Sequence, residues 1–189
     1  MRTVIIAIST LLFAATVTKA GPATVAELSP ELREALVRDA ACSKDSAPGP
    51  AAPKGARDRA EPKDLLRSPV DTQEILGPGR ELGVIAAFTA GCHCQGANCA
   101  TYVYLKTAGS YKLAFTGSFA SLHPMKGLRN GYPPLTGKLQ VSDSRVETTV
   151  YDWNGKKYQP SLCATVTQGP NQKRPSIARH ACSGESRPR

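Results

Sequence analysis

The sequence predicts a mainly β protein, an antiparallel meander that forms a small barrel or sandwich and is preceded by one amphipathic helix. Short runs of β-branched and aromatic residues follow one another from residue 80 to residue 166, with turn-forming residues between them. The pair Asn154-Gly155 is flanked by two such runs, which is typical of a β-hairpin. Six cysteines in 189 residues indicate a domain stabilised by disulfide bonds.

Residues 1–20 predict a secretory signal peptide. Arg2 gives a basic start, an almost wholly apolar run extends from Val4 to Val17, and the small residue Ala20 precedes Gly21. The apolar run is short for a membrane span, and no second run follows it. We therefore expect a periplasmic or secreted protein without a transmembrane segment once the signal is removed.

Residues 21–42 predict an N-terminal segment with a helix over 29–41. Ser29 can cap the first turn, and Pro30 suits the first helical position. Apolar residues recur at every fourth position and form one stripe, namely Leu28, Leu32, Leu36 and Ala40. We expect this stripe to dock on the β domain, with Cys42 holding the helix in place.

Two segments are expected to lack regular strands. Residues 43–79 form a spacer rich in proline and alanine, with short helical turns at 64–67 and 70–76 on either side of Pro69. Residues 167–189 form a basic, polar tail that we expect to be mostly disordered, apart from an anchor at Cys182.

The β domain is expected to occupy residues 80–166. In the second strand, Tyr102 and Tyr104 should lie on one face and Val103 and Leu105 on the other. In the third strand, Tyr111, Leu113 and Phe115 alternate with polar or small residues. The expected strands are 84–88, 100–106, 111–116, 118–125, 135–142, 145–153 and 156–159.

Several short motifs support a family resemblance. A helix ends at Cys42, a Gly/Asn-Cys loop at 96–99 precedes an aromatic strand, and the hairpin from Tyr151 precedes Cys163, with an Asn-Gly-Tyr-Pro-Pro-Leu run at 130–135 between them. These motifs resemble those of small, exported, largely uncharacterised bacterial β-domain proteins. The chain departs from that pattern in its spacer, its basic tail and the extra pair Cys92 and Cys94. The resemblance implies a fold and a compartment, not an activity.

The cysteines are expected to form structural disulfides. Cys94 or Cys92 would pair with Cys99 across a loop, in which Gly96 gives the backbone the freedom to turn. A bond from Cys42 to Cys163 would then join helix and hairpin, leaving the remaining loop cysteine for Cys182. Fifteen pairings are possible, so this map is a preference.

Two other chemistries compete for the cysteine loop. Cys92, Cys94 and Cys99 with His93, His123 or His180 could hold zinc or copper, although the Cys-x-Cys-x₄-Cys spacing is not a standard zinc spacing. Redox catalysis is disfavoured because the chain has no Cys-x-x-Cys motif. We therefore expect no cofactor, and keep a metal-binding envelope protein as the alternative.

The charge of the chain indicates which partners to expect. Residues 78–166 carry nine basic and four acidic residues, and residues 167–189 carry five basic and one acidic. A basic C-terminal half favours an anionic envelope component or an acidic protein as partner. Nucleic acid is not expected, because no nucleic-acid-binding motif is present.

The sequence favours a non-catalytic binding protein of the bacterial envelope. It contains no nucleophile elbow, phosphate-binding glycine loop or zinc-protease motif, so we do not expect an enzyme. Tyr151, Trp153, Lys156 and Lys157 form a candidate binding surface at the hairpin, although such aromatic residues more often pack beside a hairpin. An inhibitor of a secreted hydrolase is a further alternative, since a basic inhibitor would suit an acidic target.

Overall fold

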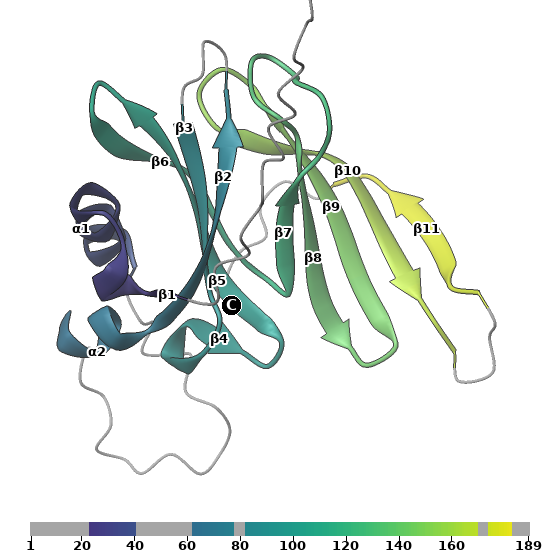
Figure 1. Ribbon diagram of the computed structural model, residues 1–189. Coiled ribbons are helices and arrows are strands. Elements are labelled where there is room, and N and C mark those ends of the chain that lie inside the picture. The colour runs from purple at the N-terminus through teal and green to yellow at the C-terminus, as the bar shows by residue number, and fades with distance from the viewer. Residues whose placement is uncertain (1–22, 41–61, 78–81, 170–173, 183–189) are drawn as a thin grey trace, which may run out of the picture.

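The computed structural model describes residues 23–40, 62–77, 82–169 and 174–182. Within these ranges it is mainly β, as the sequence predicts, with two antiparallel sheets that pack as a sandwich and do not close into a barrel (Figure 1). No helix of the described ranges is long and apolar enough to cross a membrane. The predicted signal peptide, most of the spacer and Cys42 lie outside the described residues.

The first sheet is built around β5 (Asn98–Thr107), which pairs with three other strands of the sheet. β3 (Leu82–Phe88) pairs with one edge of β5, and β6 (Ser110–Phe119) pairs with it as a hairpin. The remaining strands are β2 (Pro69–Leu76) and β1 (Ala23–Thr24) beyond β3, and the short β4 (Cys94–Gln95), which pairs with the start of β5.

The second sheet is a simple meander in which each strand pairs with the next one in the chain. Its strands are β7 (Ser121–Pro124), β8 (Leu135–Ser142), β9 (Arg145–Trp153), β10 (Tyr158–Thr167) and β11 (Ser176–His180). The chain passes from the first sheet to the second at Ala120, whose N–H donates to the carbonyl of Lys138 at 2.8 Å. Strands that change sheet at a bend form the corners of such sandwiches.

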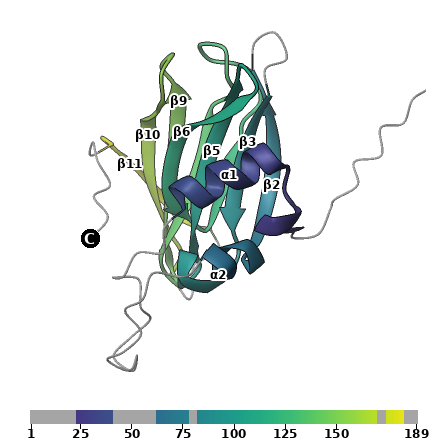
Figure 2. The same ribbon diagram turned by 90° about the vertical axis from the view of Figure 1, so that its left-hand side faces the viewer.

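One face of the first sheet is covered by helices (Figure 2). α1 (Pro30–Asp39) begins after Ser29, whose hydroxyl accepts a hydrogen bond from the Leu32 N–H, as predicted. The short α2 (Pro62–Arg67) lies beside it. The predicted stripe of α1 is buried against the sheet, and the hydroxyl of Tyr104 donates to the carbonyl of Ala35 at 3.3 Å. Burial is the main cause that raises the pKa of the Tyr104 phenol.

The opposite face of the first sheet packs against the second sheet. Alternation along β5 places Tyr102 and Tyr104 in the core beneath the helices and Val103 and Leu105 in the core between the sheets, which confirms the predicted faces. The core between the sheets is rich in aromatic rings, contributed by Phe115, Phe119, Tyr132, Tyr151, Trp153 and Tyr158.

A side-chain amide links the two sheets away from this core. Asn98, the first residue of β5, donates from Nδ2 to the carbonyl of Gln140 and accepts at Oδ1 from the Gln140 N–H, both at 2.8 Å. The amide therefore satisfies both backbone groups of a residue in β8, much as a neighbouring strand would.

Three expectations from the sequence are wrong. Residues 70–76 were expected to form helical turns and instead form most of β2. Val70 enters the core beneath the helices and Ile75 the core between the sheets, and the four residues between them are exposed, so the strand shows no alternating pattern in the sequence. The tail was expected to be mostly disordered, yet residues 176–180 form β11, paired with β10. The alternation of the third strand is broken by a bulge between Leu113 and Phe115, which leaves Leu113 exposed.

Candidate functional site

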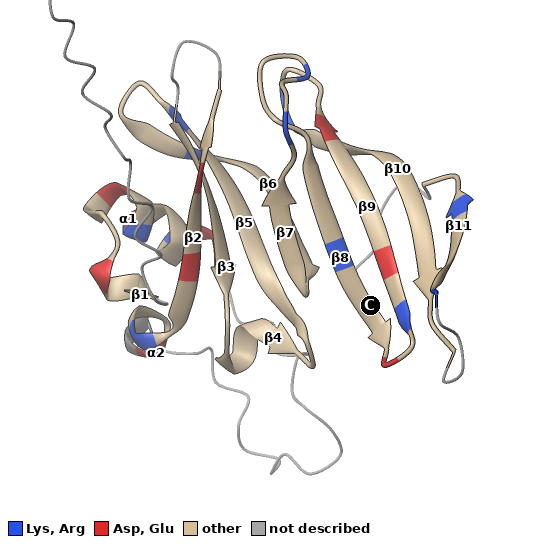
Figure 3. Ribbon diagram, turned by 45° about the vertical axis from the view of Figure 1, so that its right-hand side comes forward, with Lys and Arg blue, Asp and Glu red and all other residues tan. Residues whose placement is uncertain are grey.

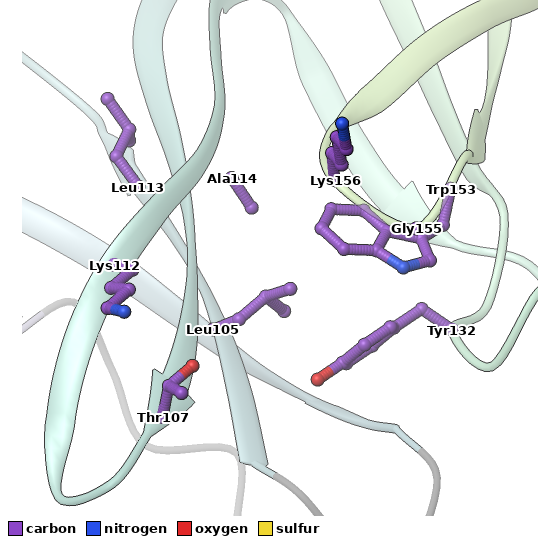
Figure 4. A pocket seen from close by; sticks show the side chains of 9 residues that line it. All are labelled: Leu105, Thr107, Lys112, Leu113, Ala114, Tyr132, Trp153, Gly155 and Lys156. Carbon is purple, nitrogen blue, oxygen red and sulfur yellow. The ribbon is translucent and has the colours of Figure 1, made fainter.

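A half-open cleft of about 360 Å³ lies at the end of the sandwich where β5 meets β6 and β9 meets β10 (Figure 4). The rings of Tyr132 and Trp153 lie on one side, opposite Leu105 and Ala114. The other lining residues are Thr107, Lys112, Leu113, Gly155 and Lys156. The cleft thus has an aromatic and aliphatic interior with lysines among its lining residues.

The β9–β10 loop is shaped by Asn154. Trp153 pairs with Tyr158, so the predicted hairpin is confirmed, but it closes through four residues and not through a two-residue Asn-Gly turn. The Asn154 Oδ1 accepts from the N–H groups of Lys156 and Lys157, each at 2.9 Å. These bonds fix the backbone from which both lysine side chains project.

The loop at 125–134 holds Tyr132 against Trp153. Their ring centroids are 5.3 Å apart in an edge-to-face arrangement. Arg129 forms an ion pair with Asp152 at 3.0 Å, and the Asn130 Nδ2 donates to the carbonyl of Trp153 at 2.8 Å. The cleft wall is therefore fastened to the end of β9 at Trp153 and at the residue before it.

The electrostatic character of the cleft is positive. None of its nine lining residues is an Asp or a Glu, whereas Lys112 and Lys156 are both exposed. The basic residues of the β5–β6 hairpin and of the loop between β7 and β8 lie toward the same end of the molecule (Figure 3). Asp152, the carboxylate nearest in sequence to the cleft, is already paired with Arg129. This charge pattern favours a ligand that carries an anionic group.

The structure brings together only part of the predicted binding surface. Trp153 and Lys156 line the cleft, but Lys157 lies on the same loop without lining it. Tyr151 packs in the core, with its ring centroid 4.6 Å from that of Phe115, so it does not form an exposed platform. Trp153 is itself largely buried, which confirms that these aromatic residues pack beside the hairpin.

Sequence reasoning missed seven of the nine lining residues, and among them Lys112 and Tyr132 give the cleft a charge and an aromatic ring. Tyr132 lies in the Asn-Gly-Tyr-Pro-Pro-Leu run, which the sequence indicated only as a motif of the family resemblance and not as part of a site. Gly77 directly follows β2, and a Cβ there would come within 2.3 Å of the Tyr132 ring, so the close approach of the backbone to Tyr132 requires glycine at this position.

Disulfides account for the cysteines of the described residues. Cys94 pairs with Cys99, one of the two expected loop bonds, and Cys163 pairs with Cys182. The predicted bonds from Cys42 to Cys163 and from a loop cysteine to Cys182 are therefore wrong, because β11 brings Cys182 beside β10. Cys92 is also disulfide-bonded.

The disulfides bear on the alternative of a metal site on the cysteine loop. Cys92, Cys94 and Cys99 are all engaged in disulfides and offer no thiolate to a metal. In the part of the chain that the structure describes, no three His, Cys, Asp or Glu side chains are grouped to hold a metal ion. His93 turns into the protein and stacks on Phe88, with ring centroids 3.9 Å apart.

The buried His93 is expected to make stability depend on pH. Burial lowers the pKa of the His93 imidazole, so the folded protein favours the neutral ring. This contribution to stability is complete above the unfolded pKa of about 6.5 and is lost as the pH falls through the lower folded pKa. We expect the urea midpoint of unfolding to fall between pH 7 and pH 5. His93→Phe keeps a ring against Phe88 and should flatten that decline, whereas an unchanged slope would contradict a role for His93.

Comparison of the chain with family models, with curated proteins and with solved structures found no match. The resemblance to small exported bacterial β-domain proteins stays a prediction. The function must therefore be argued from the site itself.

Proposed function

We propose that this protein is an exported, non-catalytic binding domain of the bacterial envelope, and that it binds an anionic ligand in the cleft between the β5–β6 hairpin and the β9–β10 loop. The observation that carries the proposal is the pair Lys112 and Lys156, exposed at an aromatic cleft without a lining carboxylate. A ring or an apolar body would contact Tyr132 and Trp153, and its anionic group would meet the lysines.

The surroundings of the cleft support binding and not catalysis. Its lining residues include no His, Cys, Asp or Glu, the side chains that most often transfer protons or act as nucleophiles. The walls are fixed by the Arg129–Asp152 ion pair and by the bond from Asn130 to the Trp153 carbonyl. A preformed cleft lowers the entropy cost of binding. The disulfides support export, because such bonds persist in oxidising compartments.

The single tryptophan of the chain gives a direct test, because Trp153 lines the cleft. We expect its fluorescence to change saturably on titration with glycerol 3-phosphate, glucuronate or inorganic phosphate, and not with glycerol or glucose. Lys112→Ala and Lys156→Ala should each weaken binding by about tenfold or more, since a hydrogen bond to a charged group contributes about 1.5–3 kcal/mol.

Lys138→Ala is the matched control, because Lys138 is exposed on β8 and does not line the cleft. It should leave the affinity unchanged. The proposal fails if none of the three anions changes the fluorescence, or if the change persists at full affinity in the double variant of Lys112 and Lys156.

A further inference from the structure

We infer that the anionic group bound at this end of the molecule belongs to phospholipids of a bilayer, and that the protein docks on the membrane surface through three loops. The three-loop end comprises the β5–β6 hairpin tip (residues 106–113), the loop at 125–134 and the loop at 154–157. This inference rests on the proposed function and names the source of its anion.

Exposed apolar side chains are the first observation. Leu128 is 60% exposed, Leu113 42% and Met125 41%, and all three belong to the three-loop end. Large apolar side chains in a loop that already carries lysines are not needed to bind a small soluble anion. They suit the boundary between lipid headgroups and acyl chains, where an apolar side chain can leave water while its basic neighbours contact phosphates.

The second observation is the charge at the same place. Lys112, Lys126, Lys156 and Lys157 are all exposed. None of them takes part in an ion pair within the described part of the chain, where the one ion pair at this end joins Arg129 to Asp152. Four unneutralised lysines on one end of a domain are attracted to an anionic surface, since each contributes to binding within a Debye length of the lipid phosphates.

The three loops form one contiguous surface. Residues of all three line the same cleft, and Arg129 and Asn130 bind the end of β9 directly. Each loop also has a projecting tip, because a Cβ placed at Gly109, Gly127 or Gly155 would meet nothing within 4 Å. Three projecting tips on one end allow lysines and apolar side chains to reach a flat surface together.

Vesicle co-sedimentation tests the inference. The exported protein, with its N-terminus first established by mass spectrometry, is mixed with vesicles of phosphatidylcholine alone or with added phosphatidylglycerol. We expect binding only to the anionic vesicles, and weaker binding as salt is raised. Lys126→Ala and Lys157→Ala should each reduce the partition coefficient about fivefold. Leu128→Ser should reduce it by a similar factor without changing the titration of Trp153 by glycerol 3-phosphate.

Matched variants at other positions guard against a general loss of folding. Val141→Ser removes an apolar side chain that is 47% exposed at the end of β8 away from these loops, and Lys138→Ala removes an exposed lysine in the middle of that strand. Neither should change vesicle binding. If soluble phosphates bind in the cleft but anionic vesicles do not bind, the membrane inference is overturned and the proposed function stands. If vesicles bind equally well without anionic lipid, or after Leu128→Ser and Lys126→Ala together, the three-loop end is not the docking surface.

Discussion

Replacing Phe119 with alanine is expected to lower the free energy of unfolding by about 3–5 kcal/mol. Phe119 ends β6, one residue before the chain passes into the second sheet, and only 8% of it is exposed. Its ring centroid lies 5.9 Å from those of both Phe115 and Tyr151. The ring therefore packs against side chains of both sheets at the corner that joins them.

The cavity left by this change should be hard to fill. A Cβ at Gly117 would lie 2.6 Å from the Phe119 ring, and one at Gly137 would lie 2.7 Å from it. These two glycines bring backbone against the ring, and backbone cannot move inward as a flexible side chain can. A cavity that does not collapse increases the cost of a large-to-small substitution.

Urea unfolding followed by circular dichroism measures this effect. Leu128→Ala is the control, because Leu128 is 60% exposed, and it should change stability by no more than about 0.5 kcal/mol. A loss below about 1 kcal/mol for Phe119→Ala, with an unchanged denaturant slope, would contradict the packing of the two sheets at this corner.

The sequence predicted the regular parts of the sandwich well, for physical reasons. In β5, aromatic residues alternate with aliphatic residues because each set enters a different core. β8 and β9 begin and end where expected, because turn-forming residues such as Asp143 mark their bounds. A period of two residues between clear turns can be recognised without tertiary information.

Two strands could not be recognised because their stability does not come from a repeated pattern of buried side chains. β2 buries only Val70 and Ile75, on opposite faces, so no period of two appears. In β11 all five side chains are exposed, and the strand is held mainly by backbone pairing with β10 and by the disulfide beyond it, with exposed side-chain hydrogen bonds at Ser176 and His180. Neither a backbone partner nor a disulfide partner is encoded locally.

The sequence predicted two residues of the candidate site, Trp153 and Lys156, and missed Lys112 and Tyr132, because local patterns do not show which distant segments meet. Trp153 and Lys156 are neighbours in one hairpin, so local reasoning could group them. Lys112 and Tyr132 come from other segments, and they reach the cleft only because the chain changes sheet at Ala120 and folds the two sheets face to face. A meander predicts which strands are adjacent, but not where it bends.

Loss of the bond between Cys163 and Cys182 is expected to release β11 while the rest of the sandwich stays folded. The strand has no buried side chain, so backbone pairing, the disulfide and two exposed side-chain hydrogen bonds, from Ser176 to the Thr167 carbonyl and between Thr165 and His180, hold it to β10. A bond that closes a segment of 19 residues contributes about 3 kcal/mol in the chain-entropy model. With Cys163→Ser and Cys182→Ser together, the free energy that holds β11 should fall by about that amount.

Amide hydrogen exchange separates this local release from global unfolding. Protection should be lost at residues 176–180, whereas amides of β5 and β8 should keep theirs, because their protection depends on the core between the sheets. Cys94→Ser with Cys99→Ser is the matched comparison, since that bond closes a separation of only five residues and lies in the other sheet. If the first pair leaves β11 protected, strand pairing alone holds the end of the sheet and the disulfide is not what fixes it. If the loss of Cys94–Cys99 also exposes β11, the release is a general destabilisation and is not caused by the bond at β11.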